Sequence, residues 1–127
     1  MKTVTTVVHM LLRLAGLTAI VLGVLFWTGN ALSLIPIHML VGFVVVLSLW
    51  TLAVLAARAG VQRGLVALAL VWGLIVPILG IMQNRLLPGS AHWVIQVVHL
   101  LVGMGAVGQG EGLATRMKQA RTPASQP

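Results

Sequence analysis

The chain has 127 residues, of which 59% are hydrophobic and 7% are charged, and it contains no cysteine. In soluble domains about one quarter of the residues are charged, so this composition indicates a membrane protein. The lack of cysteine excludes disulfides, thiolate metal sites, iron–sulfur clusters and covalent c-type haem, but it does not exclude b-type haem. The net charge is +7, yet the basic residues lie at the ends of apolar segments, as membrane topology requires, so we expect no nucleic-acid partner.

Four apolar segments are long enough to cross a bilayer, which takes about 20 residues per helix. They cover residues 4–27, 34–57, 65–87 and 91–110. Their links are short, and Ser90 in the last link is placed to cap the fourth helix. Short links force neighbouring helices to be antiparallel, which predicts an all-α fold: an integral-membrane, up-down-up-down four-helix bundle in residues 1–112. Residues 113–127 are expected to form a basic, polar, disordered cytoplasmic tail.

The basic residues predict an orientation in the lipid bilayer. In this topology one side of the membrane receives Lys2, Arg13, Arg58, Arg63, Arg116, Lys118 and Arg121, and the other side receives Arg85. Because cytoplasmic loops carry an excess of Lys and Arg, we expect both termini to be cytoplasmic in a multi-pass protein of the cell inner membrane.

An internal repeat is visible in the two halves of the chain. His38-Met39-Leu40-Val41-Gly42 recurs as His99-Leu100-Leu101-Val102-Gly103, an offset of 61 residues (99 − 38). The preceding glycine pair Gly16 and Gly23 recurs as Gly73 and Gly80, an offset of 57 residues (73 − 16). The ordered recurrence predicts a duplicated two-helix hairpin, with chance similarity between apolar sequences as the alternative.

The two repeated histidines predict a haem site. Ionisable residues at bilayer depth are costly and mark functional sites. Haem iron takes an imidazole on each face, and a glycine four residues further along the helix shares the histidine's face and leaves room for the macrocycle. We therefore expect His38 and His99 to be the metal ligands of one haem b in the outer half of the bilayer, beside Gly42 and Gly103. Near the propionates we expect Asn84, Arg85 and His92.

The four-span pattern and the two His-x3-Gly motifs resemble small four-helix membrane b-type cytochromes, and loosely the cytochrome b561-like family. The resemblance implies histidine-held haem and electron transfer with quinol or a redox partner protein; an enzyme of this kind would be a haem-dependent oxidoreductase acting on quinol or a small oxidant. Such proteins commonly bind two haems with a second histidine late in the last span. Residues 107–113 contain none, so we expect one bis-histidine haem, and the glycine-rich faces allow a homodimer.

Two other functions compete with electron transfer. One is metal binding or transport at a three-imidazole site of His38, His92 and His99, in which the two glycines would have no purpose. The other is a structural or assembly subunit whose histidines merely pair across helices. Among the remaining polar residues, His9 and Arg13 are expected to contact lipid headgroups, and Glu111 is expected to pair with a nearby base.

Overall fold

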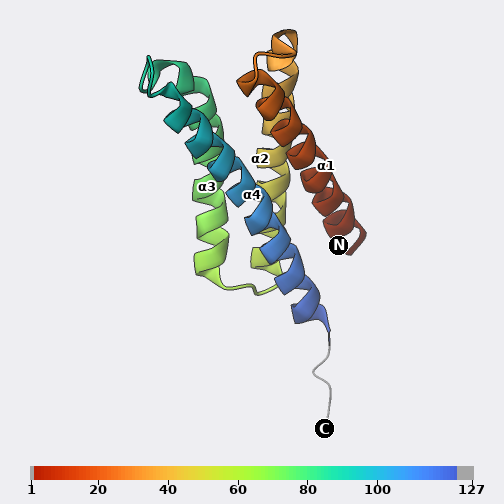
Figure 1. Cartoon of the computed structure of the whole chain (residues 1–127). Helices are drawn as coiled ribbons and strands as arrows, with labels where there is room; N and C mark the ends of the chain where they lie inside the picture. Colours follow the sequence, from red (N-terminus) through yellow and green to blue (C-terminus); the bar gives the residue numbers. More distant parts are fainter. Residues whose placement is uncertain (1, 123–127) are drawn as a thin grey trace.

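The computed structural model describes residues 2–122. It contains four long helices and two short 3-10 turns (Figure 1). These are α1 (Lys2–Trp27), η1 (Leu32–Leu34), α2 (Ile35–Arg58), α3 (Arg63–Met82), η2 (Gln83–Arg85) and α4 (His92–Arg121). All four helices are long and apolar enough to span a membrane, which confirms the prediction of an all-α membrane protein.

Local sequence explains where the first two helices end. Gly29 follows α1 with φ of 80°, and Gly60 follows α2 with φ of 83°. The next residue in each case donates back into the helix, Asn30 N–H to Leu25 O at 2.8 Å and Val61 N–H to Ala56 O at 3.0 Å. This is the Schellman arrangement, in which a left-handed glycine lets the turn satisfy the last carbonyls.

The fourth helix differs from the prediction at both ends. Its N-cap is Ala91, which makes no side-chain hydrogen bond, so the expected capping by Ser90 is wrong. At the other end α4 continues to Arg121, because Leu113 and Met117 form a buried stripe on its inner face. The expected tail is therefore helical over residues 113–121, and residues 123–127 lie outside the described part of the chain.

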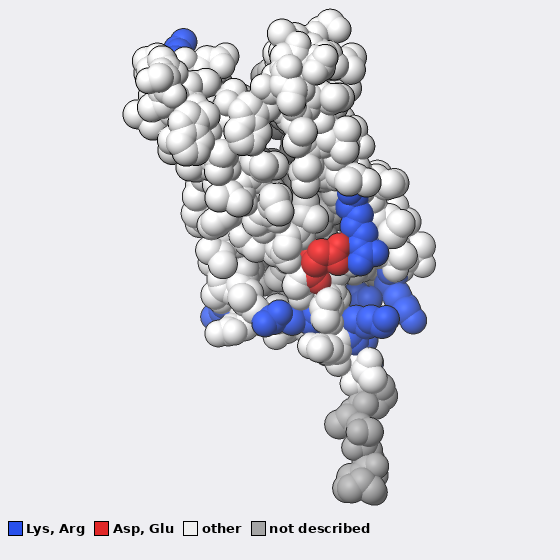
Figure 2. Space-filling model, viewed as in Figure 1, with Lys and Arg blue, Asp and Glu red and all other residues white. Residues whose placement is uncertain are grey.

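The two ends of the bundle are different. The links at residues 28–34 and 83–91 both lie at one end, which we call the histidine end (Figure 1). The N-terminus, the turn at residues 59–62 and the last turn of α4 lie at the opposite end, which we call the basic end. Basic side chains gather toward the basic end (Figure 2), and among the described residues of the two links at the histidine end Arg85 is the one Lys or Arg.

The core lies in the half of the bundle nearer the basic end. Helices α2 and α4 contact each other and both remaining helices, whereas α1 and α3 do not touch within the described residues. The fully buried large side chains are Leu12, Leu49, Leu52 and Met117. The outward faces carry exposed apolar residues such as Leu17 and Leu40, at 63% and 62% exposure, as expected for surfaces that meet lipid. Toward the histidine end, the α1–α2 pair diverges from the α3–α4 pair (Figure 1).

Candidate functional site

A pocket of about 540 Å³ lies between the two helix pairs at the histidine end. All four helices line it; Val45 and Val76 belong to both its wall and the core, and Gln83, Asn84 and His92 lie near its mouth. Figure 2 shows the surface hollowed between the two groups of helices. This volume lies within the range of about 300–1,000 Å³ that is typical of small-molecule and cofactor sites.

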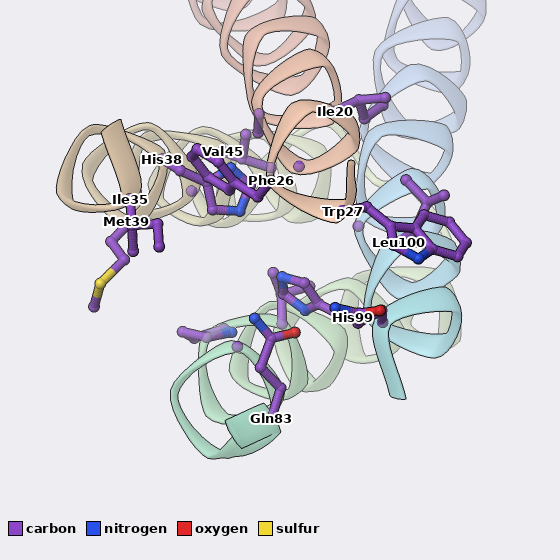
Figure 3. Close-up of a pocket in the computed structure, with 18 of the residues that line it drawn as sticks. Ile20, Phe26, Trp27, Ile35, His38, Met39, Val45, Gln83, His99 and Leu100 are labelled. Carbon is purple, nitrogen blue, oxygen red and sulfur yellow. The ribbon is translucent and has the colours of Figure 1, made fainter. Parts of the chain in front are cut away.

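The pocket brings the two repeated histidines together. His38 lies in the first turn of α2 and His99 in the second turn of α4, and their ring centroids are 6.3 Å apart with planes inclined at 66°. Figure 3 shows both imidazoles directed into the space between the helix pairs. Two imidazoles on opposite sides of one metal have centroids about 6 Å apart, because each metal–nitrogen bond is about 2 Å and each nitrogen lies about 1 Å from its ring centre. The observed separation fits a shared metal.

Each imidazole has an unsatisfied nitrogen. The Nδ1 atoms of His38 and His99 are buried and have no hydrogen-bond partner among the described residues. A buried polar atom without a partner costs free energy, so such atoms call for an explanation such as a missing ligand.

The two predicted glycines border open space. Gly42 and Gly103 both line the pocket, and a Cβ atom added at either would meet no atom within 4 Å. Glycine therefore widens the pocket one helical turn below each histidine, where a flat macrocycle would need room. The pocket wall also contains Phe26, whose ring packs edge-on against His38 at 5.3 Å between centroids. This contact was not predicted. The one indication of it in the sequence is an aromatic residue near the end of the first apolar segment.

The structure brings part of the predicted polar group to the mouth of the pocket. Asn84 and His92 line the pocket, but Arg85 does not, and Gln83 and Gln96 do. Residues 83–85 form a 3-10 turn with about three residues per turn, so two of them face the pocket while the third points elsewhere. The pocket wall contains no Lys, Arg, Asp or Glu within the described chain.

The structure gives no support to a three-imidazole metal site. His92 Nδ1 lies 3.1 Å from the carbonyl oxygen of Leu86, so this side chain bridges the loop before α4. In residues 2–122 no three His, Asp or Glu side chains are grouped to hold a metal ion. Haem needs only two protein ligands for a six-coordinate iron, because the macrocycle supplies the other four nitrogens.

Glu111 and two basic residues form a separate cluster across α1 and α4. Arg13 donates from Nε to Glu111 Oε1 at 2.6 Å and from Nη2 to Oε2 at 2.9 Å, and His9 Nε2 lies 2.8 Å from Oε2. The prediction that Glu111 pairs with a base is confirmed. His9 and Arg13 belong to this cluster, which contributes no residue to the pocket, and their contact with lipid headgroups stays a prediction.

No protein-family model, no curated protein and no solved structure matches this chain. The function is therefore argued from the geometry of the pocket alone.

Proposed function

We propose that this chain is a b-type haem-binding membrane protein that transfers electrons, with His38 and His99 as the axial ligands of one haem. The observation that carries the proposal is the histidine pair itself, with centroids 6.3 Å apart in a pocket formed by all four helices. The buried Nδ1 atoms and the open space at Gly42 and Gly103 support it.

The pocket residues would hold the group, and bound haem would supply a reversible one-electron change. Neutral imidazoles avoid the cost of burying charged histidine. Phe26 and the apolar walls exclude water, and the amides of Gln83, Asn84 and Gln96 are donors for carboxylates at the mouth. We infer that the redox partner is quinol or a small redox protein; an enzymatic role would be that of a haem-dependent oxidoreductase.

We also infer an up-down-up-down bundle that arose by duplication of a two-helix hairpin. Matching environments in the two halves support this inference. His38 and His99 line the same pocket, and Gly42 and Gly103, four residues further along α2 and α4, both border open space. Environments repeated in this way are expected for two copies of a hairpin around a twofold axis along the membrane normal.

The side of the membrane follows from the charges. Six of the eight Lys and Arg residues lie in the first turn of α1, beside the turn at residues 59–62 or in the last two turns of α4; Arg13 lies three turns into α1, and Arg85 lies at the other end. By the positive-inside rule we place the basic end and both termini in the cytoplasm of a cell whose inner membrane holds the protein. The haem site then lies in the outer half of the bilayer.

A structural or assembly subunit is the second candidate. The edge-to-face contact between the two imidazole rings favours it, because histidines that only pair across helices need no cofactor. A structural role alone does not explain the unpartnered Nδ1 of His99 or the open space beside Gly42 and Gly103.

The test is the optical spectrum of the detergent-purified protein, as isolated and after reduction with dithionite. We expect a Soret band with resolved α and β bands on reduction, and their loss in both His38→Ala and His99→Ala. His9→Ala, a histidine at the opposite end, is the control and should retain the spectrum. A colourless protein that takes up no added haemin, or an unchanged spectrum in His38→Ala, would overturn the proposal.

A further inference from the structure

Two other glycines lie directly against the histidine rings. A Cβ atom added at Gly23 of α1 would lie 3.6 Å from Cε1 of His38, and one added at Gly80 of α3 would lie 3.1 Å from Cε1 of His99. In both cases the glycine approaches the same atom, the carbon between the two ring nitrogens. Among the five glycines of the pocket wall, two thus touch an imidazole, Gly42 and Gly103 border open space, and Gly16 packs against Val107.

The two contacts are equivalent within the internal repeat. Gly23 and Gly80 hold the same place in the repeated glycine pattern, 57 residues apart (80 − 23). Each contacts the repeated histidine on the helix that follows it, α2 after α1 and α4 after α3. Because glycine has no side chain, the imidazole can approach the backbone of the neighbouring helix closely. A contact made twice in corresponding positions indicates a common role.

We propose that Gly23 and Gly80 are positioning residues that set the orientation of the two imidazoles, and that Gly80 is the stricter of the two. Carbon atoms in good contact are about 3.5–4.0 Å apart. A methyl group at position 23 would meet His38 at that ordinary distance, whereas at position 80 it would lie inside it. Alanine at position 80 must therefore displace the His99 ring by a few tenths of an ångström, and alanine at position 23 leaves the His38 ring nearly in place.

The role of these glycines toward haem rests on the proposed function, but their contact with the rings does not. A displaced His99 ring would change the direction from which its nitrogen meets the iron, and haem spectra respond to the orientation of axial ligands. We therefore expect Gly80→Ala to change the g-values of the low-spin ferric haem in electron paramagnetic resonance more than Gly23→Ala does. Haem binding itself should persist, because both ligands remain.

The decisive experiment observes the rings without haem. Full-length protein in detergent micelles, with histidine labelled with ¹³C at Cε1, gives one resonance for each of its four histidines, assigned by single substitutions. We expect Gly80→Ala to shift the His99 resonance and leave that of His38 in place. Gly23→Ala should produce a smaller shift confined to His38, and it supplies an independent reading if Gly80→Ala does not fold.

The matched controls are Gly42→Ala and Gly103→Ala, whose methyl groups meet no atom and should leave both ring resonances unchanged. The inference is overturned if Gly80→Ala leaves the His99 resonance in place or if Gly103→Ala shifts it equally. A wild-type protein that takes up no haemin, but whose His99 resonance responds selectively to Gly80→Ala, would refute the proposed function and retain the positioning role. If the protein binds haem normally but Gly80→Ala causes no selective shift of the His99 resonance, the proposed function is retained and the positioning role is refuted.

Discussion

Glycine has opposite roles in the half of the bundle nearer the basic end and in the half nearer the histidine end. Near the basic end, the space beside Gly110 is filled by the side chain of Leu12, and a Cβ atom there would overlap with it. Near the histidine end, Gly42 borders open space and no atom lies within reach of an added Cβ. A preorganised cofactor site requires both kinds of region. The filled half fixes the helices, and the hollow half presents the two imidazoles. The difference implies that substitutions in one half change stability and substitutions in the other change binding.

The largest effect on stability is expected for Leu52→Ala in the filled half. Leu52 is fully buried, close to Leu12 and to the backbone of Gly110. Lipid is about as apolar as the protein interior, so burial of the leucine side chain away from lipid contributes little free energy. The expected loss of unfolding free energy, about 2 kcal/mol, therefore comes from the cavity and the missing packing contacts. The measurement is unfolding in mixed micelles with increasing denaturing detergent. Leu47→Ala, on the same helix but 60% exposed, is the control. Equal losses in both variants would mean that the core does not hold the bundle together.

The same substitution made in the two halves tests the comparison directly. Gly110→Ala should destabilise the fold by about 1 kcal/mol, the lower end of the usual cost of overpacking, because the terminal methyl group of Leu12 has to shift. Gly42→Ala should instead stabilise α2 by up to about 1 kcal/mol, because alanine favours the helix. It should also lower the amount of haem bound per protein, since the methyl group enters space that we assign to the macrocycle. Unfolding midpoints and haem-to-protein ratios of both variants measure the two effects. Full haem binding by Gly42→Ala would contradict this assignment of the space.

A smaller loss is expected when the charge of Glu111 is removed. Glu111→Gln leaves Arg13 without its bidentate partner and weakens the link between α1 and α4. The side chains of Arg13 and Glu111 are 50% and 36% exposed, so water and salt already screen the pair. We therefore expect a drop in thermal midpoint smaller than that of Leu52→Ala and reduced at high salt. The double variant Arg13→Gln with Glu111→Gln should lose less than the sum of the single losses. Strict additivity would show that the pair adds nothing to stability.

Sequence predicts the helices well because the requirement for an apolar span is local. Residues 4–27 and 34–57 closely match α1 and α2, which end at glycines with positive φ. The prediction was wrong for residues 113–121, where the average composition is polar. There a buried stripe of Leu113, Ala114 and Met117 keeps the helix packed on the bundle, and composition alone does not register such spacing.

The candidate site was predictable only where its geometry is local. A histidine and a glycine four residues apart share one helix face, so His38 with Gly42 and His99 with Gly103 reach the same pocket. The contact of Gly80 with His99 depends instead on how two helices are rotated against each other, which neither helix's sequence specifies. The role of the histidines as axial ligands stays a prediction.

The smallest effect concerns two tryptophans between the helices. Trp72 donates from Nε1 to the carbonyl oxygen of Val102 at 2.8 Å, and Trp50 donates to that of Leu70 at 3.1 Å. Each helical carbonyl also accepts from its own helix, and single hydrogen bonds between membrane helices contribute on average about 0.6 kcal/mol. Trp72→Phe and Trp50→Phe should each lower the free energy of unfolding by about that amount. Because Val102 precedes the pocket residue Gly103, Trp72→Phe should also loosen the α3–α4 pair next to the site, whereas Trp50→Phe should not. The comparison of the two halves would need revision if Trp72→Phe cost more than Leu52→Ala, since the tryptophan would then hold α3 in place more strongly than the leucine core.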